Sequence, residues 1–233
     1  MNRSIFNAAR VRGLILALGL VALAGLVRGQ GTIVYMQPNQ PIYYGPVAFQ
    51  TGIDVNGDGT PDFTLFGPAP ETSVDNVVLA PLGSNRLIAI PEPPPDTGYL
   101  VAALNQGALI GPSLAGVPGA EWYSNQTDQY GHALIGAMAG IDGQISVIGY
   151  FAGKPSAYIG FDLYYDGASH YGWMQVENPL AIVAGQVVDW AYQTSPNTPI
   201  LAGQVPEPPA WTLATFGATI LALIGRLRLS RRQ

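Results

Sequence analysis

AYIGFDLYY, residues 157–165, is followed by DGAS, residues 166–169, and by HYGWMQVE, residues 170–177. Both flanking segments are rich in aromatic residues and alternate with the period of two that a β-strand requires. Asp-Gly is a common turn pair between segments of this kind. The stretch therefore predicts a β-hairpin, with strands at Ala157–Tyr165 and His170–Glu177 joined by the turn Asp166–Ser169.

Similar short strands are predicted on both sides of this hairpin. Val, Ile and Tyr recur in short runs between Gly, Pro and Asn residues, which favours strands and turns over helices. The further predicted strands are Thr32–Met36, Ile42–Gln50, a strand that ends at Phe66, Val74–Leu79, Arg86–Ile90, Ala133–Ala139, Gln144–Phe151 and Gln186–Thr194. Strands at this spacing, with no regular helix between them, predict an all-β fold: an antiparallel β-sandwich or jelly roll.

Three segments interrupt the strand pattern. Pro91–Asp96 is rich in proline, which a central strand cannot accommodate, and is predicted to be a polyproline-II segment. Small residues dominate between Tyr99 and Gly119, where a short helix is compatible with the sequence. Glu121–Tyr130 is predicted to be a polar loop.

The N-terminus has the layout of a secretory signal peptide. Arg3, Arg10 and Arg12 precede the apolar run Gly13–Val27, and small residues follow it up to Gly29. We expect a signal peptide over residues 1–29, cleaved after Gly29. An uncleaved N-terminal anchor is the alternative.

A second apolar segment lies near the C-terminus. Trp211–Gly225 contains no charged residue, and as a helix it would be about 22 Å long. The segment is shorter than the roughly 30 Å hydrocarbon core of a bilayer, so Trp211 is expected at one interface and arginine side chains at the other. The arginines that follow it are Arg226, Arg228, Arg231 and Arg232. Positive charge favours the cytoplasmic side, which predicts a transmembrane helix with its C-terminal end inside the cell.

The motif before this helix consists of Val205, Pro206, Glu207 and Pro208. Together with the helix and the terminal arginines, it resembles the PEP-CTERM sorting signal of Gram-negative bacteria, over residues 205–233. The resemblance implies processing near the motif by an exosortase, a membrane enzyme that releases or re-attaches the exported part. It also implies an association with extracellular polysaccharide. A plain C-terminal anchor with a proline-rich stalk is the alternative.

Three short segments of the middle region carry a second resemblance. Tyr158–Phe161, His170–Trp173 and Asp189–Tyr192 are similar to a pattern in other exported domains that bear this signal. The similarity extends over about Leu109–Tyr192. It implies a shared fold and assigns no catalytic residue.

The middle of the chain is strongly acidic. From residue 30 to residue 205 the only cations are Arg86 and Lys154, against 14 of the 15 acids, a formal charge of 2 − 14 = −12. An anionic surface of this kind disfavours nucleic acid and anionic lipid as partners and favours divalent cations or solubility alone. Because the chain contains no cysteine, disulfides and thiolate sites are excluded.

One loop has the residue pattern of a calcium site. Oxygen-bearing residues occur at positions 1, 3, 5, 7 and 9 of a loop with a glycine at position 6, and hard oxygen ligands suit calcium. These residues are Asp54, Asn56, Asp58, Thr60 (through its carbonyl) and Asp62. Leu65 stands where an EF-hand has its bidentate glutamate, so weak binding with a structural role is expected. The alternative is a bare turn, because Asn-Gly and Asp-Gly are ordinary turn pairs.

Other chemistries find less support in the sequence. Trp122, Tyr123 and Trp173 could stack on sugar rings if exposed, although aromatic residues on alternating strands usually belong to the core. His132 and His170 are the only histidines, which is few for a zinc site. The sequence contains no nucleophile elbow, P-loop or dinucleotide fingerprint, and nothing singles out a catalytic pair of carboxylates.

These observations predict a non-enzymatic exported protein of the cell surface or extracellular matrix of a Gram-negative bacterium. It would consist of a signal peptide (1–29), an exported β-sandwich domain (30–204) and a sorting signal (205–233). Its expected partners are an exosortase-like membrane enzyme, extracellular polysaccharide, and the membrane through the C-terminal helix, with no nucleic acid. A carbohydrate-binding module for extracellular polysaccharide is the second interpretation, and a hydrolase of unrecognised type is the third.

Overall fold

A computed structural model describes residues 32–42, 50–67, 74–92, 98–125, 133–141, 144–177 and 185–207, with the backbone alone given for 74–76, 136–141 and 144–148. Contacts divide the chain into two units, and the larger one, Gly31–Pro206, contains nearly all of these residues. The structure is all-β: no helix occurs within the described ranges. The predicted signal peptide and the predicted C-terminal helix lie outside the described residues.

The described residues form fifteen strands. In chain order they are β1 (Ile33–Met36), β2 (Gln40–Ile42), β3 (Gln50–Ile53), β4 (Phe63–Phe66), β5 (Val74–Pro81), β6 (Arg86–Pro91), β7 (Tyr99–Val101), β8 (Leu109–Ile110), β9 (Glu121–Tyr123), β10 (Ala133–Ile141), β11 (Gln144–Ile148), β12 (Ser156–Tyr165), β13 (Ala168–Glu177), β14 (Gly185–Gln193) and β15 (Ile200–Leu201).

The hairpin predicted from the opening stretch is confirmed. β12 pairs antiparallel with β13 over their whole length, from Ser156↔Glu177 to Tyr165↔Ala168. The connecting turn has two residues rather than four, because Ala168 and Ser169 already belong to β13. Asp166 and Gly167 have φ values of 51° and 76°. Positive φ at both central positions is the geometry that matches the right-handed twist of the paired strands.

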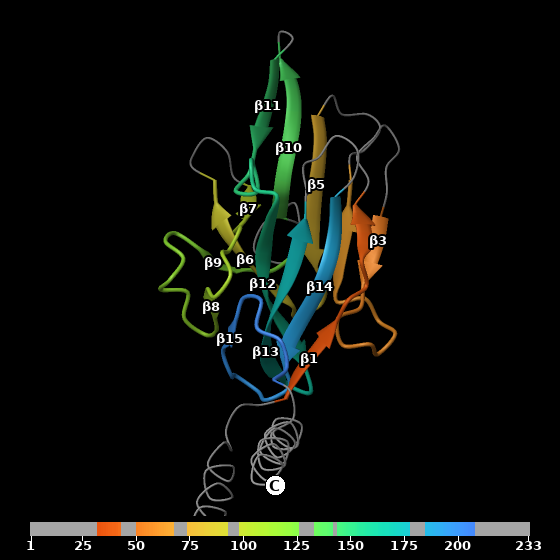
Figure 1. The fold of residues 1–233 in the computed structure, drawn as a ribbon, viewed down its shortest axis with the longest axis vertical. Coiled ribbons are helices and arrows are strands. Elements are labelled where there is room, and N and C mark those ends of the chain that lie inside the picture. Colours follow the sequence, from red (N-terminus) through yellow and green to blue (C-terminus); the bar gives the residue numbers. More distant parts are fainter. Residues whose placement is uncertain are drawn as a thin grey trace, which may run out of the picture. The chain divides into compact units, whose positions relative to one another are not determined.

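One large sheet contains most of the strands. Its 13 strands follow the order β1-β14-β13-β12-β6-β7-β10-β5-β4-β3, with β11 attached to β10, β2 to β14 and β9 to β6. β7 runs parallel to β10, whereas the other described pairs are antiparallel. A separate two-stranded sheet, β15 with β8, lies beside β13 (Figure 1).

Several sequence predictions need correction. Ile42 and Gln50, the ends of one predicted strand, lie in two different strands. Ile42 belongs to β2, which pairs with β14, whereas Gln50 belongs to β3, which pairs with β4. The segment Glu121–Tyr130 is not wholly a loop, since its first three residues form β9 beside β6. The short helix considered between Tyr99 and Gly119 is absent from that described segment, which holds β7, β8 and turns. In each case tertiary pairing outweighs a weak local preference.

The sheet curls so that strands far apart in its order face each other. Phe63 on β4 packs against Phe161 on β12, with ring centroids 5.5 Å apart. Trp190 on β14 donates its indole N–H to the carbonyl of Val55, beyond the end of β3, at 3.2 Å. A single buried cluster therefore joins β2, β3, β4 and β5 to β12, β13 and β14. Burial of this apolar surface is the main stabilising contribution to the fold.

A second cluster covers the opposite face of the central hairpin. Trp173 and Tyr171 on β13 pack there with residues from β6, β8 and β15. The Trp173 indole N–H also donates to the carbonyl of Gln204 at 3.0 Å, which ties the segment after β15 to the sheet. Both faces of β13 are thus buried, and this explains why its tyrosine and tryptophan do not face solvent.

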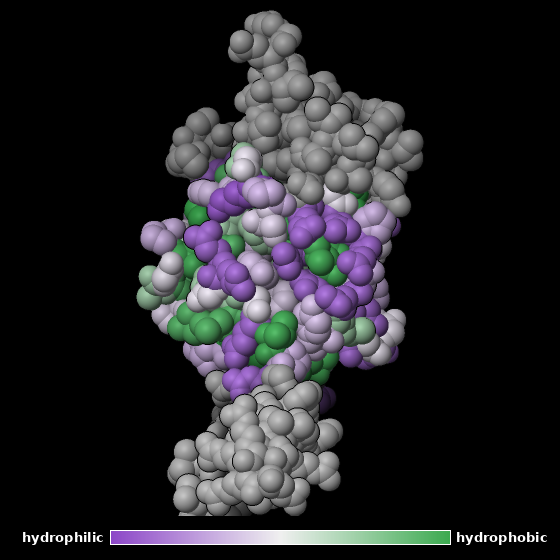
Figure 2. Space-filling view, viewed as in Figure 1, coloured by the Kyte–Doolittle hydropathy of each residue, from purple (hydrophilic) through white to green (hydrophobic). Residues whose placement is uncertain are grey.

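The described surface is largely hydrophilic on the face shown in Figure 2, where hydrophobic residues form small separate groups. Within the described ranges, no helix combines the length and the apolar character needed to cross a membrane.

Candidate functional site

The acidic loop, defined here as Asp54–Asp62, joins the antiparallel strands β3 and β4. Ile53 and Phe63 are register partners at its base, and the Asp62 N–H donates to the Ile53 carbonyl at 2.8 Å. Both partners are fully buried or nearly so, at 1% and 0% exposure. The loop is therefore anchored on the core and projects its middle into solvent.

Asp54 organises the first half of the acidic loop. Its carboxylate accepts hydrogen bonds from the backbone N–H groups of Gly57 (2.7 Å), Asp58 (3.2 Å) and Gly59 (2.8 Å). Both glycines have positive φ, 77° and 89°, which allows the chain to curl around the carboxylate. The turn chemistry of the Asx type therefore accounts for the conformation of this half of the loop.

Asn56 and Asp58 form the exposed tip. The Asp58 N–H donates to the Asn56 side-chain oxygen at 2.9 Å, and the Asn56 amide donates to the Asp58 carboxylate at 3.1 Å. The Thr60 N–H donates to the other Asp58 oxygen at 2.7 Å. The hydrogen bonds that the Asp58 carboxylate accepts, from the Thr60 N–H foremost and from the Asn56 amide, lower the pKa of Asp58.

Asp62 differs from the other acids of the loop because its side chain is buried, at 9% exposure. Its carboxylate accepts from the Val55 N–H at 2.8 Å and from the Asn85 amide at 3.3 Å. Burial raises the pKa of Asp62, against the opposing effect of these hydrogen bonds. The carboxylate thus ties the end of the loop to the turn before β6.

The five predicted ligand residues lie on one short loop, and its carboxylates accept hydrogen bonds from within the protein. Among the described residues, no group of three or more His, Cys, Asp or Glu side chains is placed to hold a metal ion. The carboxylates of Asp54, Asp58 and Asp62 point instead toward backbone and amide N–H groups. The oxygen donors are of the type that calcium prefers, and a cation would compete with these hydrogen bonds.

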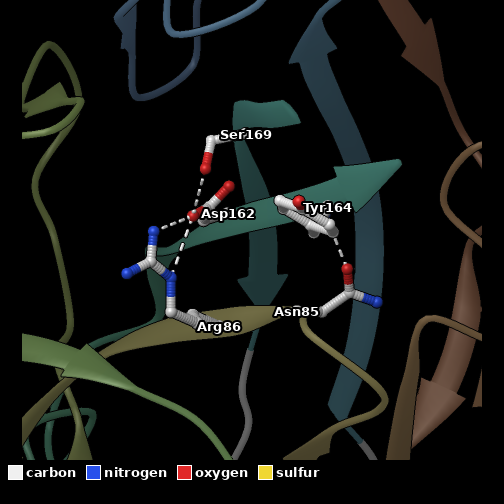
Figure 3. A network of polar contacts seen from close by, with 5 residues as sticks. All are labelled: Asn85, Arg86, Asp162, Tyr164 and Ser169. Atoms are coloured by element: carbon white, nitrogen blue, oxygen red, sulfur yellow. Dashed lines mark hydrogen bonds and ion pairs between the residues drawn. The ribbon is translucent and has the colours of Figure 1, made fainter. Parts of the chain in front are cut away.

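A second polar site lies at the start of β6, at the position where Arg86 faces Asp162 of β12 in register. The Arg86 Nε donates to Asp162 Oδ2 at 2.9 Å, and its Nη2 contacts the same oxygen (Figure 3). The Ser169 hydroxyl donates to this oxygen at 3.0 Å. Asp162 is fully buried, so the ion pair and the hydroxyl stabilise its charge away from water.

Arg86 is also held from its other side by aromatic rings. Its guanidinium carbon lies 5.4 Å from the centroid of the Trp122 ring, a cation–π distance. Trp122 in turn stacks on Tyr171, with centroids 5.6 Å apart. The side chain of Arg86 remains 38% exposed. Arg86 therefore forms part of the surface, while its charge is paired with the buried carboxylate of Asp162.

A polar pocket, of about 360 Å³, opens at this surface. Its lining residues come from the turn between β5 and β6, from β6, β12 and β13, and from the residue after β9. They are Gly83, Ser84, Arg86, Ser124, Tyr164 and Ser169. The Tyr164 side chain is 48% exposed, whereas its backbone N–H donates to the Asn85 side chain at 2.7 Å. The wall of the polar pocket is thus fixed to the same asparagine that contacts the acidic loop.

The aromatic residues proposed for sugar stacking do not form an exposed platform. Tyr123 is 0% and Trp173 is 1% exposed, and they lie in different buried clusters. Tyr123 packs its ring against Tyr99 at 4.7 Å, while Trp173 is bonded to Gln204. Only Trp122 of the three retains exposed surface. A sugar could not stack on Tyr123 or Trp173 without opening the core.

The remaining site residues are described only in part. Val205, Pro206 and Glu207 are exposed and follow the last core contacts of the domain. Pro208 and the histidine at position 132 lie outside the described residues. His170 is buried, with its Nδ1 donating to the Gln193 carbonyl at 2.9 Å and its ring stacked on Tyr165. This environment gives His170 a packing role in the hairpin.

Comparison with protein-family models, with curated proteins and with solved structures found no match. The polar pocket and its ion pair were not anticipated from the sequence. A signal was present, because Arg86 is one of two cations between residues 30 and 205, and Asp162 is the one charge within AYIGFDLYY. An isolated acid in a buried strand needs a partner, and few cations are available to supply it.

Proposed function

We propose that the chain is a non-enzymatic exported protein of the cell surface or extracellular matrix, sorted through its C-terminal signal by an exosortase-like membrane enzyme. The observation that carries the proposal is the charge distribution. A segment with formal charge −12 lies between two apolar runs, each flanked by arginines. Arginine clusters favour the cytoplasmic side, and so both ends point to export of the acidic middle.

The position of the motif supports processing. Val205 is 46% exposed, and Pro206 and Glu207 are exposed as well. Gln204, the residue before the motif, is tied to the core by the hydrogen bond that its carbonyl accepts from Trp173. A protease could therefore reach the motif without unfolding the domain, since its described backbone, residues 205–207, takes no part in a sheet.

A β-sandwich or jelly roll is the proposed scaffold. Phe63 and Phe161 approach across the core from strands that are distant in the sheet order, as two facing layers require. The parallel contact of β7 with β10 is a local departure from antiparallel pairing. Calcium bound in the acidic loop is proposed to stiffen this scaffold rather than to perform chemistry.

The sorting proposal is tested by expressing the full chain in a Gram-negative host with and without an exosortase. We expect a shorter product only when the enzyme is present, detected by mass spectrometry, and its loss in Glu207→Ala. Glu92→Ala is the matched control, because Glu92 lies in a second Pro-Glu-Pro tripeptide. An identical product pattern in the wild type and in Glu207→Ala contradicts processing at the motif.

Topology is tested separately. A periplasm-active reporter inserted near residue 100 should be active, and a cytosol-active reporter at the same position should not. Reporter activity confined to the cytosol would overturn export and the surface role together.

A further inference from the structure

We propose that the polar pocket binds a neutral, hydroxyl-rich small molecule of the class of a single sugar unit. This inference stands on the geometry around Arg86 and does not depend on export or on processing of the tail. It also differs from the stacking site expected at Trp122, Tyr123 and Trp173, because none of those residues lines the polar pocket.

The size and the lining of the polar pocket limit the ligand. A volume of about 360 Å³ lies at the small end of ligand sites, which run from about 300 to 1,000 Å³. Such a volume suits one ring better than a long polymer segment. The lining residues are a cation, three serines, a glycine and a tyrosine, so the wall is largely polar and suits a polar ligand better than an apolar one.

Charge and hydrogen-bonding groups at the polar pocket disfavour ionic ligands. The guanidinium of Arg86 is already paired with the buried carboxylate of Asp162, which cancels its charge for a ligand. The surrounding domain carries a formal charge of −12, which repels anions. The guanidinium offers only N–H donors, so its ligand needs an acceptor oxygen, which a metal cation lacks. A neutral ligand avoids both penalties.

The hydrogen-bonding groups match hydroxyls. Figure 3 shows the third nitrogen of the Arg86 guanidinium pointing away from Asp162, where it can donate to a ligand oxygen. The Ser169 hydroxyl donates its hydrogen to Asp162, so its oxygen retains lone pairs that can accept from a ligand. A sugar hydroxyl both donates and accepts. It can therefore satisfy at once Arg86 on β6 and Ser169 on β13, the two strands that flank β12.

Tyr164 supplies an aromatic surface. Its side chain lines the polar pocket and is 48% exposed, although a large aromatic residue normally gains stability from burial. The apolar face of a sugar ring could pack on this surface. The backbone of Tyr164 is fixed by the Asn85 side chain, so the ring is presented from a rigid position.

The test uses the full-length chain in a zwitterionic detergent that has no sugar headgroup. Glucose, galactose, mannose and their disaccharides are the neutral probes, and glucuronate and inorganic phosphate are the anionic ones. Ligand-observed NMR saturation transfer detects binding, and a titration gives the affinity. We expect at least one neutral sugar to bind in the millimolar range, and the anions not to bind.

Tyr164→Ala is the main variant, because it shortens a half-exposed side chain and keeps the backbone hydrogen bond. Loss of the ring contact should weaken binding about two- to tenfold. Tyr150→Ala is the matched control: Tyr150 is 43% exposed and does not line the polar pocket. Thermal unfolding curves that coincide with wild type verify that both variants are folded.

Three results would overturn the proposal. These are no saturation transfer from any neutral sugar, binding confined to glucuronate or phosphate, and equal affinities of wild type and Tyr164→Ala.

Discussion

The side-chain amide of Asn85 donates to both the carbonyl and the carboxylate of Asp62, at 3.1 and 3.3 Å. Its oxygen accepts from the Tyr164 N–H at 2.7 Å. One buried residue, 6% exposed, therefore joins the acidic loop to the wall of the polar pocket. Both polar groups of this side chain, the amide nitrogen and the oxygen, therefore hold distant parts of the chain together.

Asn85→Ala is expected to reduce the free energy of unfolding by about 1–3 kcal/mol, because it leaves buried groups of Asp62 and Tyr164 without partners. Urea denaturation of the full-length chain measures the change. Asn105→Ala provides the control, since Asn105 is exposed and lies in a turn before β8. Equal losses in the two variants would show that the bridging role is not the cause.

The buried carboxyl of Asp62 predicts an unusual pH dependence. Burial raises its pKa above the ordinary value of 3.8, so the folded state favours the protonated form. Its contribution to stability is therefore fully present below pH 3.8 and is lost as the pH rises through the folded pKa. In calcium-free buffer, Asp62→Asn should gain stability relative to wild type over that window. A difference in stability between wild type and Asp62→Asn that stays constant with pH would contradict the raised pKa of Asp62.

Calcium should favour the ionised form of the acids in the loop, whereas burial favours the protonated form of Asp62. We expect weak binding by the wild type, with a dissociation constant of about 10⁻⁴–10⁻³ M, and no heat of binding for Asp58→Ala. Isothermal titration calorimetry measures both. Asp166→Asn is the matched control, because it removes an exposed acid from the hairpin turn outside the loop. Flat traces for every protein would leave the loop as a bare turn.

Local signals were sufficient to predict the hairpin and most strands. The pairing of Asp166-Gly167 with alternating aromatic segments is decided within about twenty residues, and the turn geometry follows from the same dipeptide. The pattern of the acidic loop is local in the same sense, since its residues are sequence neighbours. The hydrogen bonds between the side chains of the acidic loop and its own backbone also fit the alternative of a bare turn without calcium.

The polar pocket and the fate of the aromatic residues depend on contacts between distant residues. Arg86 and Asp162 are 76 positions apart, and Asn85 and Tyr164 are 79 apart. Alternation along β13 shows that Trp173 and Met174 face opposite sides, but not which side is covered. Here both sides are covered, because β8, β15 and the segment up to Gln204 pack on the outer face. Such coverage is a tertiary property that no local pattern contains.

The ion pair of Arg86 and Asp162 predicts strong coupling between two substitutions. Arg86→Met leaves a fully buried carboxylate without its cation and should cost up to about 3–5 kcal/mol of unfolding free energy. Replacing both residues, in Arg86→Met with Asp162→Leu, removes the unpaired charge and should recover most of that loss. Denaturant unfolding of the two single variants and the double variant gives the coupling energy. Additive losses would mean that the pair makes no specific contribution.

The close packing of β13 on β12 and β14 requires a glycine at position 172. A Cβ atom at this position would lie 2.2 Å from the Phe161 ring and 2.6 Å from the Ala191 carbonyl oxygen. Ala191 belongs to the ladder between β13 and β14, where it is the register partner of Trp173, so its carbonyl cannot move without disturbing that pairing. We therefore expect Gly172→Ala to destabilise the fold by about 1–3 kcal/mol or more through overpacking.

Gly116→Ala is the control for this substitution, because a Cβ atom there would meet no atom within 4 Å. Thermal unfolding of both variants distinguishes a steric effect from the general effect of replacing glycine. Alanine at position 116 should leave the midpoint unchanged or raise it slightly, since it reduces the entropy of the unfolded chain. If Gly172→Ala were equally harmless, Phe161 could not lie as close to β13 as the structure shows. The described packing of the central hairpin would then be incorrect.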